Sequence, residues 1–150
     1  MSGIYLVVWD NENKQLSHVL EPTKGGWPHI TVAHTGNLLT KDVLLVLAAD
    51  IFKEWALKPV TLAHARVNSF MDSSGNMRHD ILMDLSTTDS EAIEKTRRSH
   101  FSEVDTERFS MQPPHVTYES CVSQIAAEMI AHELNDRLPY QVVVTGVAIK

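Results

Sequence analysis

The sequence contains almost no cysteine, which excludes two ways of stabilising a small protein. Cys121 is the only cysteine among 150 residues, so neither an intrachain disulfide nor a zinc finger built on several cysteines can form. A single thiol is typical of proteins from a reducing compartment. We therefore expect a cytoplasmic location.

Long apolar segments are also missing. The apolar run from Gly3 to Trp9 is too short for a signal peptide or a membrane span, and no basic residues precede it. No other segment approaches the length that a bilayer requires. We expect neither a signal peptide nor a membrane as partner.

The chain lacks an excess of positive charge. Its formal net charge of −6 argues against the broad basic surface that binds duplex nucleic acid. A small anionic ligand remains compatible, because a few well-placed donors suffice for one or two phosphates. The charge therefore limits the size of a partner and leaves its chemistry open.

Glycine and proline are sparse, with six of each, and the chain has no low-complexity run or linker. Hydrophobic residues make up 43% of the sequence, enough for an ordinary globular core. At this length the chain fits one domain, which we expect to span residues 1–150.

Periodic apolar residues predict three helices. Leu44, Ile51 and Trp55 lie at helical spacing in a helix from Thr40, its N-cap, to about residue 57. Thr88 and Glu91 form a capping-box pattern that predicts a second helix through residue 101. Either Ser120 or Ser123 can cap a third helix over 124–138, which Pro139 ends.

Alternating and β-branched residues predict the strands of an α+β protein. Residues 15–21 form either a further strand or an irregular segment. The predicted strands cover residues 3–9, 28–34, 60–70, 77–85, 115–119 and 140–149, with a turn at 72–76.

One tetrapeptide pattern occurs twice, as Pro28-His29-Ile30-Thr31 and as Pro114-His115-Val116-Thr117. Side chains alternate across a strand, so each copy presents one imidazole and one hydroxyl on the same face. A helix and then at least one more strand follow each copy. This layout predicts a pseudo-twofold architecture in which the two pairs meet.

Two imidazoles at one phosphodiester can divide acid and base catalysis. A neutral imidazole takes the proton of the attacking hydroxyl or water, and an imidazolium protonates the leaving oxygen. The hydroxyls can hydrogen-bond the phosphate oxygens. We predict His29, Thr31, His115 and Thr117 as catalytic residues, with no metal and no cofactor.

On these motifs, and on the opening strand "IYLVV", the chain resembles the two-histidine (2H) phosphoesterase superfamily, also called LigT-like. The resemblance implies a bilobed fold with two antiparallel sheets lining a central groove and helices outside. It also implies metal-independent cleavage of nucleotide phosphodiesters. Family members usually carry a clear helix before the first motif, whereas residues 11–26 are short and weakly helical.

This departure looks more like compact viral and phage members that cleave 2′-5′ oligoadenylates or cyclic oligonucleotide immune signals. Size, compactness and acidic charge favour the phage anti-CBASS branch, which would act in the host cytoplasm. One alternative is a 2′-5′ oligoadenylate or 2′,3′-cyclic phosphate phosphodiesterase of RNA processing. An alternative of another class is a non-catalytic protein that sequesters a nucleotide.

Five further residues are candidates for substrate binding. Tyr5 and Trp9 alternate with core positions and either stack on a base or fill the core. Trp27 either covers the mouth of the groove or packs locally. Arg66 and Arg78 either pair with phosphate or lie on a solvated sheet face.

Simple alternation makes further assignments. It groups Leu62 with His64 and Arg66 on one face, and it places His34 on the face opposite His29. His34, His64 and His79 lack an accompanying carboxylate or cysteine cluster, so a metal site is not expected. The residues leave open which histidine is the base and whether the chain forms oligomers.

Overall fold

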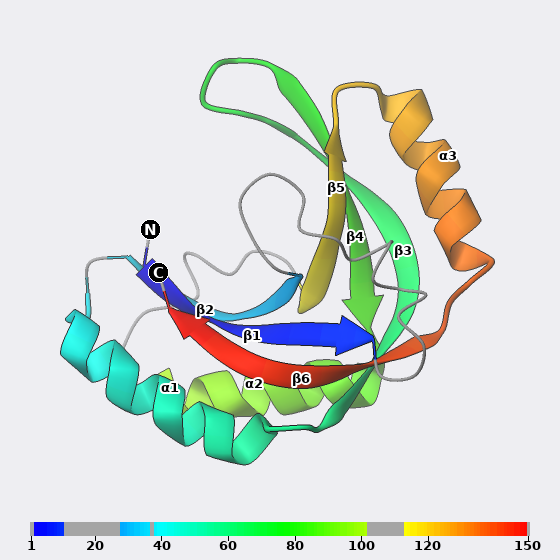
Figure 1. The fold of residues 1–150 in the computed structure, drawn as a ribbon. Helices are drawn as coiled ribbons and strands as arrows, with labels where there is room; N and C mark the ends of the chain where they lie inside the picture. The colour runs from blue at the N-terminus through cyan, green and yellow to red at the C-terminus, as the bar shows by residue number, and fades with distance from the viewer. Residues whose placement is uncertain (1, 11–27, 37, 102–112, 150) are drawn as a thin grey trace.

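A computed structural model describes residues 2–10, 28–36, 38–101 and 113–149 (Figure 1). The predicted order of strands and helices is confirmed, while the segment 15–21 lies outside the described residues. The elements are β1 Ser2–Asp10, β2 His29–Gly36, α1 Lys41–Trp55, β3 Pro59–Met71, β4 Met77–Leu85, α2 Thr87–Phe101, β5 His115–Cys121, α3 Gln124–Asn135 and β6 Tyr140–Ile149.

The six strands form one closed antiparallel sheet in the order β1–β2–β5–β4–β3–β6. Its two halves, β2–β1–β6 and β5–β4–β3, each have long pairings around a central strand. Ile30 and Val116 are the one residue pair that joins β2 to β5, and four pairs join β3 to β6. The two predicted sheets are therefore halves of a single sheet.

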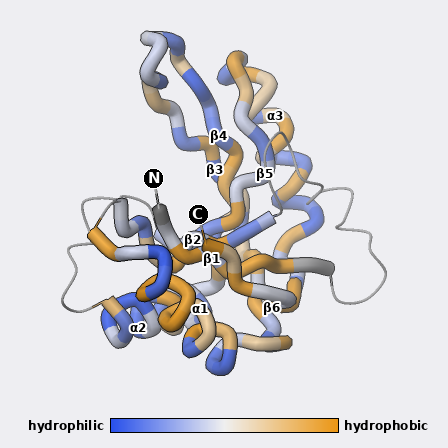
Figure 2. Tube along the Cα trace, turned by 60° about the vertical axis from the view of Figure 1, so that its left-hand side comes forward, coloured by the Kyte–Doolittle hydropathy of each residue, from blue (hydrophilic) through white to orange (hydrophobic). Residues whose placement is uncertain are grey.

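The three helices cover the apolar face of this sheet. α1 packs on β1 and β6, α3 packs on β3, β4 and β5, and α2 contacts β2 and β4 (Figure 1). The tube in Figure 2 shows apolar stretches in β1 and β6. None of the described helices is both long and apolar enough to span a membrane.

The core is centred on one row of residues that crosses both halves. Leu6 pairs with Ile30, Ile30 with Val116 and Val116 with Met83, and all four are fully buried. Burial of each such side chain contributes about 1.5–3 kcal/mol. The row that joins the halves is thus also the centre of the hydrophobic core.

Helix caps confirm two sequence predictions and correct one. The Thr40 and Ser123 hydroxyls accept hydrogen bonds from backbone N–H groups at the starts of α1 and α3. α2 begins earlier than predicted, because Ser86 accepts from the Asp89 N–H at 3.3 Å and donates to its carboxylate at 3.0 Å. The capping pair predicted at Thr88 is therefore wrong by two residues.

α3 ends at Asn135, three residues before the predicted end. The Asn135 amide bonds the backbone of β3 in both directions, accepting from Ala65 N at 2.8 Å and donating to Ala65 O at 3.0 Å. These bonds tie the last turn of the helix to the strand.

A bulge in β3 corrects the predicted face of Leu62. Leu62 pairs with Leu85 and His64 with Asp84, which leaves Ala63 as an extra residue. The alternation shifts by one position there, and Leu62 lies fully buried in the core while His64 is exposed. Leu62 and His64 therefore do not share a face.

Candidate active site

The pairing of Ile30 with Val116 brings the two repeated motifs side by side. When the antiparallel register is continued by one residue each way, His29 lies across from Thr117 and Thr31 lies across from His115. All four side chains occur on the sheet side opposite the buried Ile30 and Val116. As diagonal neighbours, the two histidines are about 7–8 Å apart at the backbone.

We call this side of the sheet the polar face. A separation of that size between backbones allows two imidazoles to flank a single phosphate group. The structure therefore brings together the four predicted catalytic side chains.

The prolines of the two motifs occupy equivalent places. The Pro28 carbonyl accepts a hydrogen bond from Val8 N at 3.1 Å, and the Pro114 carbonyl accepts one from Leu85 N at 3.3 Å. Both prolines precede their strands, where a missing N–H costs no ladder bond. The sequence repeat thus reflects equivalent strand starts in the two halves.

The ring orientation of His115 is fixed by a backbone carbonyl. Its Nδ1 lies 2.7 Å from the Pro113 oxygen, and because that oxygen only accepts, Nδ1 must carry a proton. A neutral His115 therefore has its lone pair on Nε2. Burial lowers the pKa of His115 below 6.5, the Pro113 bond opposes this shift, and nearby Asp84 raises the pKa while Arg66 lowers it.

A buried carboxylate lies beside His115. Asp84 is 7% exposed and pairs with His115 across β4 and β5. Its Oδ2 accepts from Arg66 Nε at 2.6 Å and lies 3.2 Å from His64 Nε2, while Oδ1 is buried without a hydrogen-bond partner. Sequence analysis missed Asp84, although a carboxylate inside the apolar run of β4 is a signal of its own.

The surroundings of His29 are different. Its neighbour on β1 is the apolar Val7, and the ring of Tyr5 meets the His29 ring edge-on at 5.1 Å between centroids. Tyr5 lies on the polar face as predicted but is only 7% exposed, so its ring packs between neighbours. The two catalytic candidates therefore have unlike environments, one aromatic and one ionic.

His34 lies on the same face as His29, which overturns the alternation-based prediction. Tyr5 pairs with Thr31 and Gly3 with His34, so β2 contains one residue more than β1 over this span. The Tyr5 and His34 rings are 5.9 Å apart, and the charges of His29 and His115 both act on His34. The structure thus adds a third imidazole to the polar face.

Solved structures share this architecture. The structure of Kluyveromyces marxianus Usb1 with uridine monophosphate matches with a TM-score of 0.56 at 14% identity, covering 99% of this chain and 96% of that one. The chain has the Usb1 fold. A second Usb1 structure from the same organism gives a TM-score of 0.51 at 12% identity over the same shares of both chains. At these identities the likeness concerns the fold.

The fold is the α+β architecture that the sequence predicted. No protein-family model and no curated protein sequence matches the chain.

Within the Usb1 fold, the other predicted substrate-binding residues have different positions. Arg66 is part of the ionic cluster at Asp84 and is close enough to influence His115. Trp9 lies in β1, but its side chain is outside the description, and Trp27 is outside the described residues.

Arg78 lies near the turn of the β3–β4 hairpin, at the opposite end of β4 from Asp84. Its guanidinium donates to Ser120 Oγ at 3.2 and 3.3 Å. Arg78 is six residues from Asp84 along β4, which corresponds to about 20 Å. The structure does not bring Arg78 together with the two histidines.

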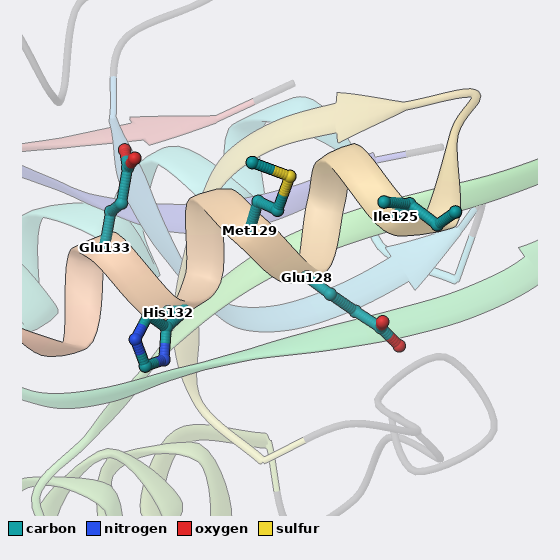
Figure 3. A pocket seen from close by; sticks show the side chains of 5 residues that line it. All are labelled: Ile125, Glu128, Met129, His132 and Glu133. Carbon is teal, nitrogen blue, oxygen red and sulfur yellow. The ribbon is translucent and has the colours of Figure 1, made fainter.

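A hollow of about 330 Å³ lies elsewhere, on the outer face of α3 (Figure 3). Its lining residues are Ile125, Glu128, Met129, His132 and Glu133. They are exposed, opposite the residues that α3 buries against the sheet. Among the residues that the structure describes, no three His, Cys, Asp or Glu side chains are placed to hold a metal ion.

Proposed function

We propose that this protein is a metal-independent phosphodiesterase that cleaves small nucleotide phosphodiesters. The observation that carries the proposal is the pairing of Ile30 with Val116, which places two His-Thr pairs on one face of the sheet. The Usb1 fold supports it, because Usb1 has been captured with uridine monophosphate. Neither observation identifies the substrate.

The two histidines suit different roles. With Nδ1–H on the Pro113 carbonyl and a lowered pKa, His115 is neutral near pH 7 and carries its lone pair on Nε2. His115 then takes the proton from the attacking hydroxyl or water, whose oxygen forms the new bond to phosphorus. His29 gives a proton to the oxygen that leaves, and the Thr31 and Thr117 hydroxyls donate to the non-bridging oxygens.

Our preferred substrate is a cyclic oligonucleotide immune signal, as for the phage anti-CBASS members that the sequence resembles. The short chain and the net charge of −6 support a small ligand over a long polyanion. The second candidate is an RNA-processing phosphodiesterase acting on 2′-5′ oligoadenylates or 2′,3′-cyclic phosphates. The uridine monophosphate in the Usb1 structure favours this second class.

The decisive experiment incubates the protein with cyclic dinucleotides and trinucleotides, 2′-5′ oligoadenylate and nucleoside 2′,3′-cyclic phosphates, and separates the products by chromatography. We expect cleavage of at least one substrate, with activity retained in EDTA. His29→Ala and His115→Ala should each lower kcat at least about 10³-fold with the unfolding midpoint preserved.

His132→Ala on the outer face of α3 is the matched control and should behave as the wild type. Binding without any product in the whole panel would favour the sequestering protein instead. Full activity in the double histidine variant would exclude the proposed catalysis.

A further inference from the structure

A bulge in β2 determines which face of the sheet His34 occupies. Ile4 pairs with Ala33 and Tyr5 with Thr31, so Val32 has no partner of its own on β1. Val32 and Ala33 are both buried, at 2% and 0% exposed. Because two successive residues turn inward, the following residue, His34, turns to the polar face.

The ring of Tyr5 lies between two imidazoles. Its centroid is 5.1 Å from that of His29 and 5.9 Å from that of His34, with interplanar angles of 82° and 70°. A Cβ on Gly3 would come within 2.8 Å of the Tyr5 hydroxyl oxygen and 2.7 Å of the Ala33 carbonyl oxygen. Glycine at position 3 therefore makes room for the phenol beside His34.

The hydrogen-bonding state of His34 follows from its burial. Nδ1 is buried and has no hydrogen-bond partner. Burial and the charges of His29 and His115 lower the pKa of His34, so the ring is neutral at pH 7. An orphaned buried N–H is rarer than an under-satisfied acceptor, so the lone pair belongs on Nδ1 and the proton on Nε2.

No part of the catalytic proposal uses this third imidazole. In that proposal the phosphate is held between His29 and His115, whereas His34 lies further along β2, beyond Thr31 and the bulge. Thr31 and His34 pair with Tyr5 and Gly3, which are two residues apart on β1, so roughly 7 Å of strand separates them. That distance exceeds one phosphate group and fits the next nucleotide unit of a longer substrate.

We propose that His34 is a specificity-determining residue whose Nε2–H donates a hydrogen bond to an oxygen of the nucleotide adjoining the scissile phosphate. This inference rests on the proposed function and adds the substrate class: a dinucleotide or longer, rather than a lone nucleoside cyclic phosphate. Tyr5 is a positioning residue that holds the His34 ring. A neutral donor suits this place, because a further positive charge would disfavour the imidazolium that the proton transfers at His29 and His115 require.

The test measures binding by calorimetry, so that it does not depend on turnover. The probes are a dinucleotide whose leaving ester oxygen is replaced by a methylene group, so that it cannot be cleaved, and a nucleoside monophosphate, each titrated into wild type, His34→Ala and His34→Gln. We expect His34→Ala to weaken dinucleotide binding about tenfold and monophosphate binding less than twofold. His34→Gln keeps a donor near the position of Nε2 and should recover most of the loss.

A dinucleotide whose adjoining unit lacks its base identifies the oxygen. The tenfold loss persists with this probe if the acceptor belongs to the backbone and disappears if it belongs to the base. Equal losses for dinucleotide and monophosphate, with a lowered unfolding midpoint, would make His34 merely structural and overturn the inference. Unchanged dinucleotide binding in His34→Ala would overturn it as well.

The outcomes also separate the two proposals. If wild type binds the dinucleotide through His34 but cleaves no ribonucleotide, the catalytic proposal fails and the specificity inference holds. If wild type cleaves a dinucleotide and His34→Ala does so with unchanged KM, the specificity inference fails and the catalytic proposal holds. Binding of neither probe to wild type refutes both.

Discussion

Replacing Asp84 with asparagine tests the ionic environment of the proposed base. The Asp84 carboxylate is paired across the strands with His115 and raises the pKa of that imidazole, while Arg66 lowers it. Asparagine keeps the shape of the side chain and can still accept from Arg66 Nε. The substitution therefore removes the negative charge and leaves the positive one, so the pKa of His115 should fall further.

The size of the effect follows from Coulomb's law. Side chains of directly paired residues place their charges roughly 6 Å apart. With an effective dielectric constant of about 40, between the values for a protein surface and for water, the interaction is about 1.4 kcal/mol, or about one pH unit. Exchanging a charged hydrogen-bond acceptor for a neutral one should also lower the free energy of unfolding by about 1–1.5 kcal/mol.

The assay is the pH dependence of kcat/KM on the best substrate of the panel. Its acidic limb reports the ionisation of the base in the free enzyme, so Asp84→Asn should move that limb about one unit lower. Asp80→Asn is the matched control on β4, because Asp80 has a smaller influence on His115, and its limb should move less. An acidic limb that stays in place or rises would refute the base assignment, and a basic limb that falls instead would make His115 the acid.

Three further results are expected. Thr117→Val removes a proposed donor to the phosphate and should lower kcat about 10²-fold with a small change in KM, measured by initial rates; an unchanged kcat would contradict its role. The pKa values of His34 and His115 are lowered in the folded chain, so the unfolded chain binds more protons as the pH falls below about 6.5. The free energy of unfolding, measured by urea titration, should therefore be lower at pH 5.5 than at pH 7.5. Trp55→Phe removes the 2.9 Å hydrogen bond from Trp55 Nε1 to Thr96 Oγ1 and should lower the free energy of unfolding by about 1–2 kcal/mol. A decrease below about 0.3 kcal/mol in urea titrations would show that the packing of α1 on α2 does not depend on this bond.

Local sequence patterns predicted the elements well. Thr40, Ser123 and the alternating strands gave the positions of helices and strands because capping and strand periodicity depend on neighbours in sequence. The Thr88 pattern was displaced by two residues, because Ser86 and Asp89 offer the same spacing immediately after β4 ends. To choose between two capping patterns of the same spacing, one must know where β4 ends, and that depends on its tertiary contacts.

The sequence did not predict which residues of distant strands pair with one another. Two motifs 86 positions apart suggested convergence, but only the pairing of Ile30 with Val116 shows which hydroxyl lies across from which imidazole. The faces of His34 and Leu62 were wrong for one shared reason. One bulge lies between His29 and His34 and another between Leu62 and His64, and an extra residue reverses every assignment made by counting in twos across it.

The single residue pair between β2 and β5 is constrained in evolution differently from the side chains on the neighbouring strands. Ile30 and Val116 set the spacing of the two histidines, so even a change of one methyl group there would alter the distance between the two imidazoles. The neighbouring strands carry Tyr5 in β1 and the Asp84 cluster in β3 and β4, and neither sets that spacing. Descendants of this chain could therefore acquire new nucleotide preferences by substitutions at His34 and in β1, β3 and β4, while the Ile30–Val116 pair, and with it the proposed cleavage chemistry, stays fixed.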